Sequence, residues 1–127
     1  MAASKIRRRA DALLADAVLL LHAAFIVWAA LGGLAVWRWP RLAWAHLPCV
    51  AWGVWIEFSG GICPLTPLEN LLRERAGQAG YGGDFIAHYL MPLIYPEALT
   101  RPMQWLLGAA LLVLNLVIYT LAIRRRR

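Results

Sequence analysis

Two long apolar stretches limit the folds that are open to this chain of 127 residues. Residues 12–36 are interrupted in polarity only by Asp16 and His22, and residues 103–123 form a second apolar run. Each stretch is long enough for a helix to cross a hydrocarbon layer of about 30 Å. Hydrophobic residues make up 61% of the chain and charged residues 16%, which is outside the ordinary range of soluble domains. We therefore expect an all-α integral membrane helical bundle that forms a single domain over residues 1–127.

Two weaker segments complete the expected bundle. Residues 42–59 are apolar and end at a pair of glycines, whereas residues 85–99 are short and hold two prolines, so they form either a short kinked crossing or a re-entrant segment. Between them, residues 68–76 have the pattern of a short amphipathic surface helix that Gly77 closes. The prediction is four membrane-embedded segments, at about residues 12–36, 42–59, 85–99 and 103–123, plus one surface helix.

The net charge of +6 is concentrated at the two ends of the chain. Apolar spans lie between these basic ends, so we expect no nucleic acid as a partner. Four crossings place both termini and residues 60–83 in the cytoplasm, where they hold ten basic residues, against Arg38, Arg41 and Arg101 outside. Three crossings would leave residues 124–127 outside. The known bias of lysine and arginine toward the cytoplasm favours four crossings.

A break in the middle of the chain has the residues of a helix start. Thr66 and Glu69 have the spacing of a capping box, and Pro67 falls at the first helical position, where its missing N–H costs nothing. Together with Pro64 these residues are predicted to be a structural motif. We also expect residues 63–70 to fold back against residues 88–96, since both stretches are interrupted by proline and leave backbone groups to be satisfied.

Polar side chains inside apolar segments are candidate sites by default. Several have a simple structural explanation: Asp16 lies near a helix end and Asn115 is expected to hydrogen-bond between helices. Cys63, His88 and either Glu57 or Glu69 approach the same membrane face, and their donors would suit zinc. The candidates from within the segments are Asp16, His22, His46, Glu57, Cys63, His88 and Asn115.

The three histidines raise haem as a further alternative. In the four-crossing arrangement they lie at different depths, on the order of 10 Å apart, which is too far for two ligands of one iron. Along the second apolar segment, His46, Val50, Gly53 and Glu57 fall on one helical stripe that should face the bundle. We expect no bound cofactor, with zinc and haem as the alternatives.

Several short runs resemble a bacterial membrane family, the domain of unknown function 2784, over residues 12–120. The most specific is Cys63-Pro64-Leu65-Thr66-Pro67-Leu68-Glu69-Asn70. The others are Arg38-Trp39-Pro40-Arg41-Leu42, Ile56-Glu57-Phe58, Ala76-Gly77, Gly80-Tyr81, Phe85-Ile86, His88-Tyr89-Leu90 and Tyr95-Pro96. The resemblance implies a small multi-helix inner-membrane protein of bacteria, and it brings no activity with it.

These observations favour a non-enzymatic accessory or scaffold protein of the bacterial inner membrane, multi-pass with both termini cytoplasmic. Its expected partners are the lipid bilayer and either another membrane protein or a second copy of the chain. The alternative is a metal or redox protein, or an enzyme, that uses Glu57, Cys63, Glu69 and His88 near the cytoplasmic face.

Overall fold

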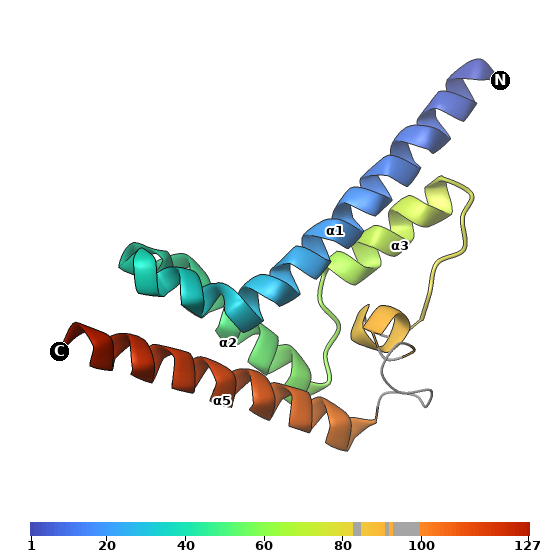
Figure 1. Cartoon of the computed structure of the whole chain (residues 1–127). Helices are drawn as coiled ribbons and strands as arrows, with labels where there is room; N and C mark the ends of the chain where they lie inside the picture. The colour runs from blue at the N-terminus through green and yellow to red at the C-terminus, as the bar shows by residue number, and fades with distance from the viewer. Residues whose placement is uncertain (83–84, 91, 93–99) are drawn as a thin grey trace. The chain divides into compact units, whose positions relative to one another are not determined.

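The computed structural model describes residues 1–82, 85–90, 92 and 100–127. Every regular element in these ranges is helical, which confirms the all-α prediction (Figure 1). The chain divides into two compact units: the first holds Met1–Ala23 and Ile62–Leu99, and the second holds Ala24–Gly61 and Thr100–Arg127. The elements are α1 (Ala2–Arg38), the 3-10 turn η1 (Pro40–Leu42), α2 (Ala43–Ser59), α3 (Leu65–Arg75), the π-helical η2 (Ile86–Leu90) and α5 (Arg101–Arg126).

Two helices are long and apolar enough to cross a membrane. They are α1, with 37 residues, and α5, with 26 residues, and only 22% of the most apolar window of each is buried. The helix α1 begins ten residues before the predicted span, because its alanine, lysine and arginine residues are strong helix formers. The helix α2 matches the second predicted segment but has only 17 residues. Most of the predicted segment 85–99 lies outside the described residues.

In the second unit, α2 and α5 pack side by side in opposite directions (Figure 1). At one end, the Arg101 guanidinium donates a hydrogen bond of 2.8 Å to the carbonyl of Phe58. At the other end, the Trp37 indole donates one of 2.9 Å to the carbonyl of Ile118. The helices approach closely at Gly108, where an added Cβ would lie 3.1 Å from the Cβ of Glu57. The end of α5 therefore lies beside the turn that joins α1 to α2.

This packing overturns one part of the predicted topology. The charge count placed Arg38 and Arg41 outside the membrane and residues 124–127 inside. In the structure the Arg125 guanidinium lies 4.6 Å from the centre of the Trp37 ring, so the two basic groups share one end of the second unit. A bilayer of about 30 Å cannot separate them. The prediction was wrong because a count of charges contains no information about which helix ends pack together.

In the first unit, α3 runs antiparallel to the beginning of α1 (Figure 1). The Arg73 guanidinium lies 3.4 Å from the Asp16 carboxylate, and a Cβ added at Gly77 would lie 3.7 Å from Arg8. Gly77 has a φ of 78°, and the chain closes α3 with hydrogen bonds from Gly77 N–H to the Glu74 carbonyl and from Gln78 N–H to the Arg73 carbonyl. This is a Schellman motif, and it confirms the predicted cap.

The start of α3 differs from the prediction. The helix begins at Leu65, its N-cap is Pro64, and no side chain makes a capping hydrogen bond there. The capping box of Thr66 and Glu69 is therefore wrong. The physical reason is that proline, with its fixed φ and no N–H, suits the first turn of a helix, so Pro64 lets the helix start two residues earlier. Glu69 is then free to turn toward other partners.

Burial is inverted relative to a soluble protein. Among the described residues, the three largest fully buried side chains are polar: His46, Glu69 and Thr66. Large apolar side chains are instead exposed along the helices that are long enough to span. On α1 they include Leu20, Leu21, Val27, Leu31 and Leu34, and on α5 Leu106, Val113, Leu116, Val117, Leu121 and Ile123.

Candidate functional site

A buried carboxylate organises the first unit. The Glu69 side chain is fully buried and accepts three hydrogen bonds. Its Oε1 accepts from Arg73 Nε at 2.8 Å and from the Tyr89 hydroxyl at 2.7 Å, and its Oε2 accepts from the Tyr81 hydroxyl at 2.9 Å. The Arg73 guanidinium also reaches Asp16 at 3.4 Å. We call Asp16, Glu69, Arg73, Tyr81 and Tyr89 the Glu69 cluster.

The loop after α3 is held so that Tyr81 reaches this carboxylate. Asn70 pairs with the backbone of Tyr81 through two hydrogen bonds, from its Nδ2 to the carbonyl at 2.8 Å and from the N–H to its Oδ1 at 3.1 Å. The Tyr81 ring then stacks on the His88 ring, with centroids 4.0 Å apart and planes 10° apart. The loop thus connects α3 to η2 through side chains.

The environment of Glu69 fixes its charge. Burial by itself raises the pKa of Glu69, but the hydrogen bonds from Tyr89, Arg73 and Tyr81 outweigh burial and lower the pKa below its ordinary value of 4.5. Burial and the bond to Glu69 raise the pKa of Tyr81. Glu69 is therefore ionised at neutral pH.

A general base or proton carrier works best with a pKa near the operating pH. A carboxylate whose pKa is lowered is therefore suited to stabilising the fold rather than to transferring protons.

A second polar node lies in the second unit. The His46 side chain is fully buried, with Nε2 2.9 Å from the carbonyl of Trp28 and Nδ1 2.7 Å from the hydroxyl of Tyr119. A carbonyl only accepts, so Nε2 carries a proton, and in that tautomer of the imidazole Nδ1 accepts from Tyr119. Beside it, Asn115 Nδ2 donates to the carbonyl of Ala29 at 3.0 Å. This contact confirms Asn115 as a hydrogen-bonding link between helices.

The predicted stripe on α2 faces this node. His46, Val50 and Glu57 are buried, and an added Cβ at Gly53 would lie 3.0 Å from Leu111. On another face of the same helix, Trp44 is 88% exposed and Trp55 is 64% exposed. The prediction that the stripe faces the bundle is confirmed, and the two tryptophans lie on an exposed face.

A family model described as Protein of Unknown function (DUF2784) matches residues 12–120. The chain belongs to this family. No curated protein and no solved structure matches the chain. The match includes every residue of the Glu69 cluster and of the His46 node, and it ends before Arg124.

The four predicted metal ligands of this DUF2784 protein fall in different places. Cys63, Glu69 and His88 belong to the first unit and Glu57 to the second. Cys63 is a half-buried free thiol, and Cys49 is free as well. Within the described ranges, no group of three or more His, Cys, Asp or Glu side chains is arranged to hold a metal ion. Zinc at these four residues stays a prediction, as does haem.

Each histidine packs in its own aromatic surroundings. His22 lies against Phe85, with ring centroids 4.2 Å apart, and His88 contacts the rings of both Tyr81 and Tyr89. The predicted approach of residues 63–70 to residues 88–96 is confirmed at one contact, between Glu69 and Tyr89, and it is made by side chains rather than by backbone groups. Residues 91 and 93–96 of that stretch lie outside the described part of the chain.

Sequence reasoning missed three members of the Glu69 cluster: Arg73, Tyr81 and Tyr89. A signal for Arg73 was present, since Glu69 and Arg73 have the i, i+4 spacing of a helical ion pair. Tyr81 and Tyr89 gave no such signal, because they reach Glu69 across a loop and a π-helical turn without a regular period.

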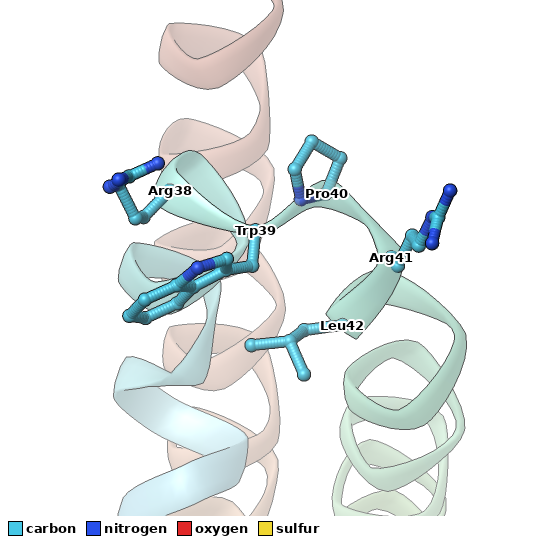
Figure 2. A pocket seen from close by; sticks show the side chains of 5 residues that line it. All are labelled: Arg38, Trp39, Pro40, Arg41 and Leu42. Atoms are coloured by element: carbon cyan, nitrogen blue, oxygen red, sulfur yellow. The ribbon is translucent and has the colours of Figure 1, made fainter.

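The turn between α1 and α2 forms an open hollow. It is lined by Arg38, Trp39, Pro40, Arg41 and Leu42 (Figure 2). Figure 2 shows the two arginine side chains diverging to opposite sides of the turn. The Arg38 guanidinium lies 5.7 Å from the centre of the Trp39 ring. Arginine and tryptophan together are typical of a membrane interface.

Proposed function

We propose that this DUF2784 protein is a multi-pass protein of the bacterial inner membrane that serves as a non-enzymatic accessory or scaffold protein. The observation that carries the proposal is the inverted burial. A soluble protein would not leave large apolar side chains exposed along α1 and α5 while it buries Glu69 and His46. In a bilayer the same arrangement is favourable, because lipid covers the apolar faces and the polar groups satisfy one another inside.

The polar groups support a structural role. Glu69 and His46 are each fixed by groups of the chain itself, and these contacts leave the Glu69 carboxylate charged and enclosed. The exposed surface of α2, with Trp44 and Trp55, offers area for lipid, for another membrane protein or for a second copy. A scaffold needs such a rigid interior and an apolar outer face.

The membrane proposal is tested by fractionation. Cells that express the chain are lysed and the membranes washed at high pH, which removes peripheral proteins. We expect the chain to stay in the pellet and to be released only by detergent. Recovery in the wash would contradict the proposal. Metal analysis and an absorption spectrum of the detergent-purified protein test the non-enzymatic part: stoichiometric zinc, or the absorption of haem or flavin, would replace the scaffold by the metal or redox alternative.

For the second unit we propose that the end with the α1–α2 turn and the C-terminus faces the cytoplasm. That end holds Arg38, Arg41 and Arg124 to Arg127, whereas Arg101 is the one basic residue at the other end by sequence. In a background in which Cys49 and Cys63 are replaced by serine, single cysteines at Arg41, Arg127 and Ser59 test this arrangement. An impermeant thiol reagent added to intact cells should label position 59 and spare 41 and 127. Labelling of 41 or 127 would contradict the proposed orientation.

A further inference from the structure

Two segments that lie more than 80 positions apart in the chain meet at one end of the second unit. Trp37 joins them, since its indole donates to the carbonyl of Ile118 at 2.9 Å and its ring lies 4.6 Å from the Arg125 guanidinium. Together the turn and the C-terminus bring six arginines to this end. We call it the basic end, and its residues are Arg38, Arg41, Arg124, Arg125, Arg126 and Arg127.

No acidic side chain of the second unit lies at the basic end. In sequence this unit holds seven arginines and a single acidic residue, Glu57. Glu57 lies near the opposite end of α2, where its Cβ approaches Gly108. The six arginine side chains of the basic end belong to exposed residues. Their charge is therefore directed outward.

Helix dipoles account for only a small part of this charge. Two helices, α1 and α5, end at the basic end, and α2 begins near it. Each helix end carries an effective charge of about half an elementary unit, negative at a C-terminus and positive at an N-terminus, so the three sum to about −0.5. Six positive charges exceed this by an order of magnitude. The remaining positive charge favours the binding of an anionic partner.

The aromatic side chains indicate where that partner lies. Trp39 is 58% exposed and Trp44 is 88% exposed, and both are near the turn. Tryptophan favours the headgroup level of a bilayer, and an arginine that lies over a tryptophan ring keeps its donors free for phosphate. The open hollow at the turn, lined by Arg38, Trp39 and Arg41 among others, presents both kinds of side chain together (Figure 2).

We propose that the basic end binds the phosphate groups of anionic phospholipids, such as phosphatidylglycerol, at the surface of the membrane in which the helices lie. The inference rests on the proposed membrane location. The apolar helices of the second unit place their ends at a bilayer surface, and arginine forms short charge-assisted hydrogen bonds with phosphate oxygens. The lipid headgroup is favoured over a nucleic acid or an acidic protein because exposed tryptophans accompany the arginines on the same turn.

The test measures lipid selectivity in the intact protein. The full chain is reconstituted into phosphatidylcholine vesicles that contain a trace of spin-labelled phosphatidylglycerol or spin-labelled phosphatidylcholine. The motionally restricted fraction of each label gives the relative association constant. We expect the association constant of phosphatidylglycerol to be about fivefold or more above that of phosphatidylcholine, which is the factor that one arginine close to the membrane surface would supply. This preference should decrease at high salt.

Matched variants locate the site. The quadruple variant Arg38→Gln, Arg41→Gln, Arg126→Gln and Arg127→Gln leaves the Arg125 contact with Trp37 intact, and its selectivity should fall toward one. The control removes four charges from the other unit, with Lys5→Gln, Arg7→Gln, Arg8→Gln and Arg9→Gln, and should keep most of the selectivity.

Three results would overturn the inference: no preference for phosphatidylglycerol in the unaltered chain, an equal loss in the control variant, or an unchanged preference in the quadruple variant. In each case the protein would still be integrated in the vesicles, so the membrane proposal would stand. Failure of the membrane proposal has a different signature, since the chain would then not enter the vesicles at all.

Discussion

The two units of the molecule differ in the balance and the pairing of their charged side chains. By sequence, the first unit holds six basic and six acidic residues, whereas the second holds seven basic residues and one acidic residue. Both ion pairs of the described residues, Arg73 with Asp16 and Arg73 with Glu69, lie in the first unit. The three arginine–tryptophan contacts of the described residues all lie in the second. The first unit therefore pairs part of its charge in internal ion pairs, whereas arginines of the second unit contact backbone and aromatic rings.

Removal of the buried charge of the first unit is expected to have the strongest effect on stability. Glu69→Gln removes the 2.8 Å ion pair of the Arg73 guanidinium, which keeps the exposed Asp16 at 3.4 Å and the amide of Gln78. It also places an amide where Tyr81 and Tyr89 donate. Loss of one partner of a buried pair costs about 3–5 kcal/mol, and we expect a decrease of this size in the free energy of unfolding, measured by SDS titration in mixed micelles. Glu74→Gln, at an exposed position of the same helix, is the control and should change stability by less than about 0.5 kcal/mol.

The result also separates two roles of Glu69. A capping residue would tolerate glutamine, because an amide closes a capping box as well as a carboxylate does. In the structure Glu69 makes no cap, so Glu69→Gln should be far more destabilising than Thr66→Ala. The reverse order would show that the helix start matters more than the ion pair, contrary to the geometry of the cluster.

Acid can remove the same charge without a mutation. Because the pKa of Glu69 is lower in the folded protein than its ordinary value of 4.5, the carboxylate contributes stability that is fully present above about pH 4.5. This stability is lost as the pH falls through the lower folded-state pKa. We expect the thermal midpoint in detergent to drop in this acidic window in the unaltered chain, and to drop less in Glu69→Gln, which has no carboxylate there. Parallel curves would assign the acid sensitivity to other groups.

A single polar change in the second unit, Tyr119→Phe, should cost less than Glu69→Gln costs in the first, because it removes a single hydrogen bond rather than an ion pair. Tyr119→Phe removes the hydroxyl that donates to His46 Nδ1 and leaves a buried acceptor without its partner. Such a loss costs about 1–3 kcal/mol, measurable by the same SDS titration. Thr120→Val removes a hydroxyl from the neighbouring exposed position and should be nearly neutral. A larger effect than that of Glu69→Gln would contradict the contrast between the units.

The contrast also explains which features were predictable from sequence. The ends of α2 and α3 at Gly60 and Gly77 were predictable, because only glycine adopts the positive φ of 70° and 78° at little cost. The inward stripe on α2 and the role of Asn115 followed from helical period and from the cost of a polar group among apolar ones. All of these are local properties of one segment.

What failed depended on contacts between segments. The two tyrosine partners of Glu69 come from a loop and a π-helical turn, and no regular sequence spacing predicts their contact with it. The separation of Arg38 from residues 124–127 by the bilayer was wrong, because it was inferred from charge alone while helix packing decides which ends meet. The family match over residues 12–120 was predictable from short runs, but it identifies the chain without giving a reaction.

An exposed arginine–tryptophan contact of the second unit should contribute least to stability. Arg125→Gln removes the cation that lies 4.6 Å from the centre of the Trp37 ring. Exposed contacts of this kind contribute about 0.5–1 kcal/mol, so we expect the free energy of unfolding to fall by an amount in this range. The control is Arg127→Gln, beyond the end of α5, which should change the free energy of unfolding by less than about 0.5 kcal/mol. A double-mutant cycle with Trp37→Phe isolates the pair. Trp37→Phe loses the hydrogen bond to Ile118 whether or not Arg125 is present, so that loss cancels in the cycle. Because phenylalanine keeps a weaker ring face for the cation, the measured coupling energy should be smaller than the energy of the full contact. If Arg125→Gln were as costly as Glu69→Gln, the arginines of the second unit would be internal supports of the fold, and the division of roles between the two units would fail.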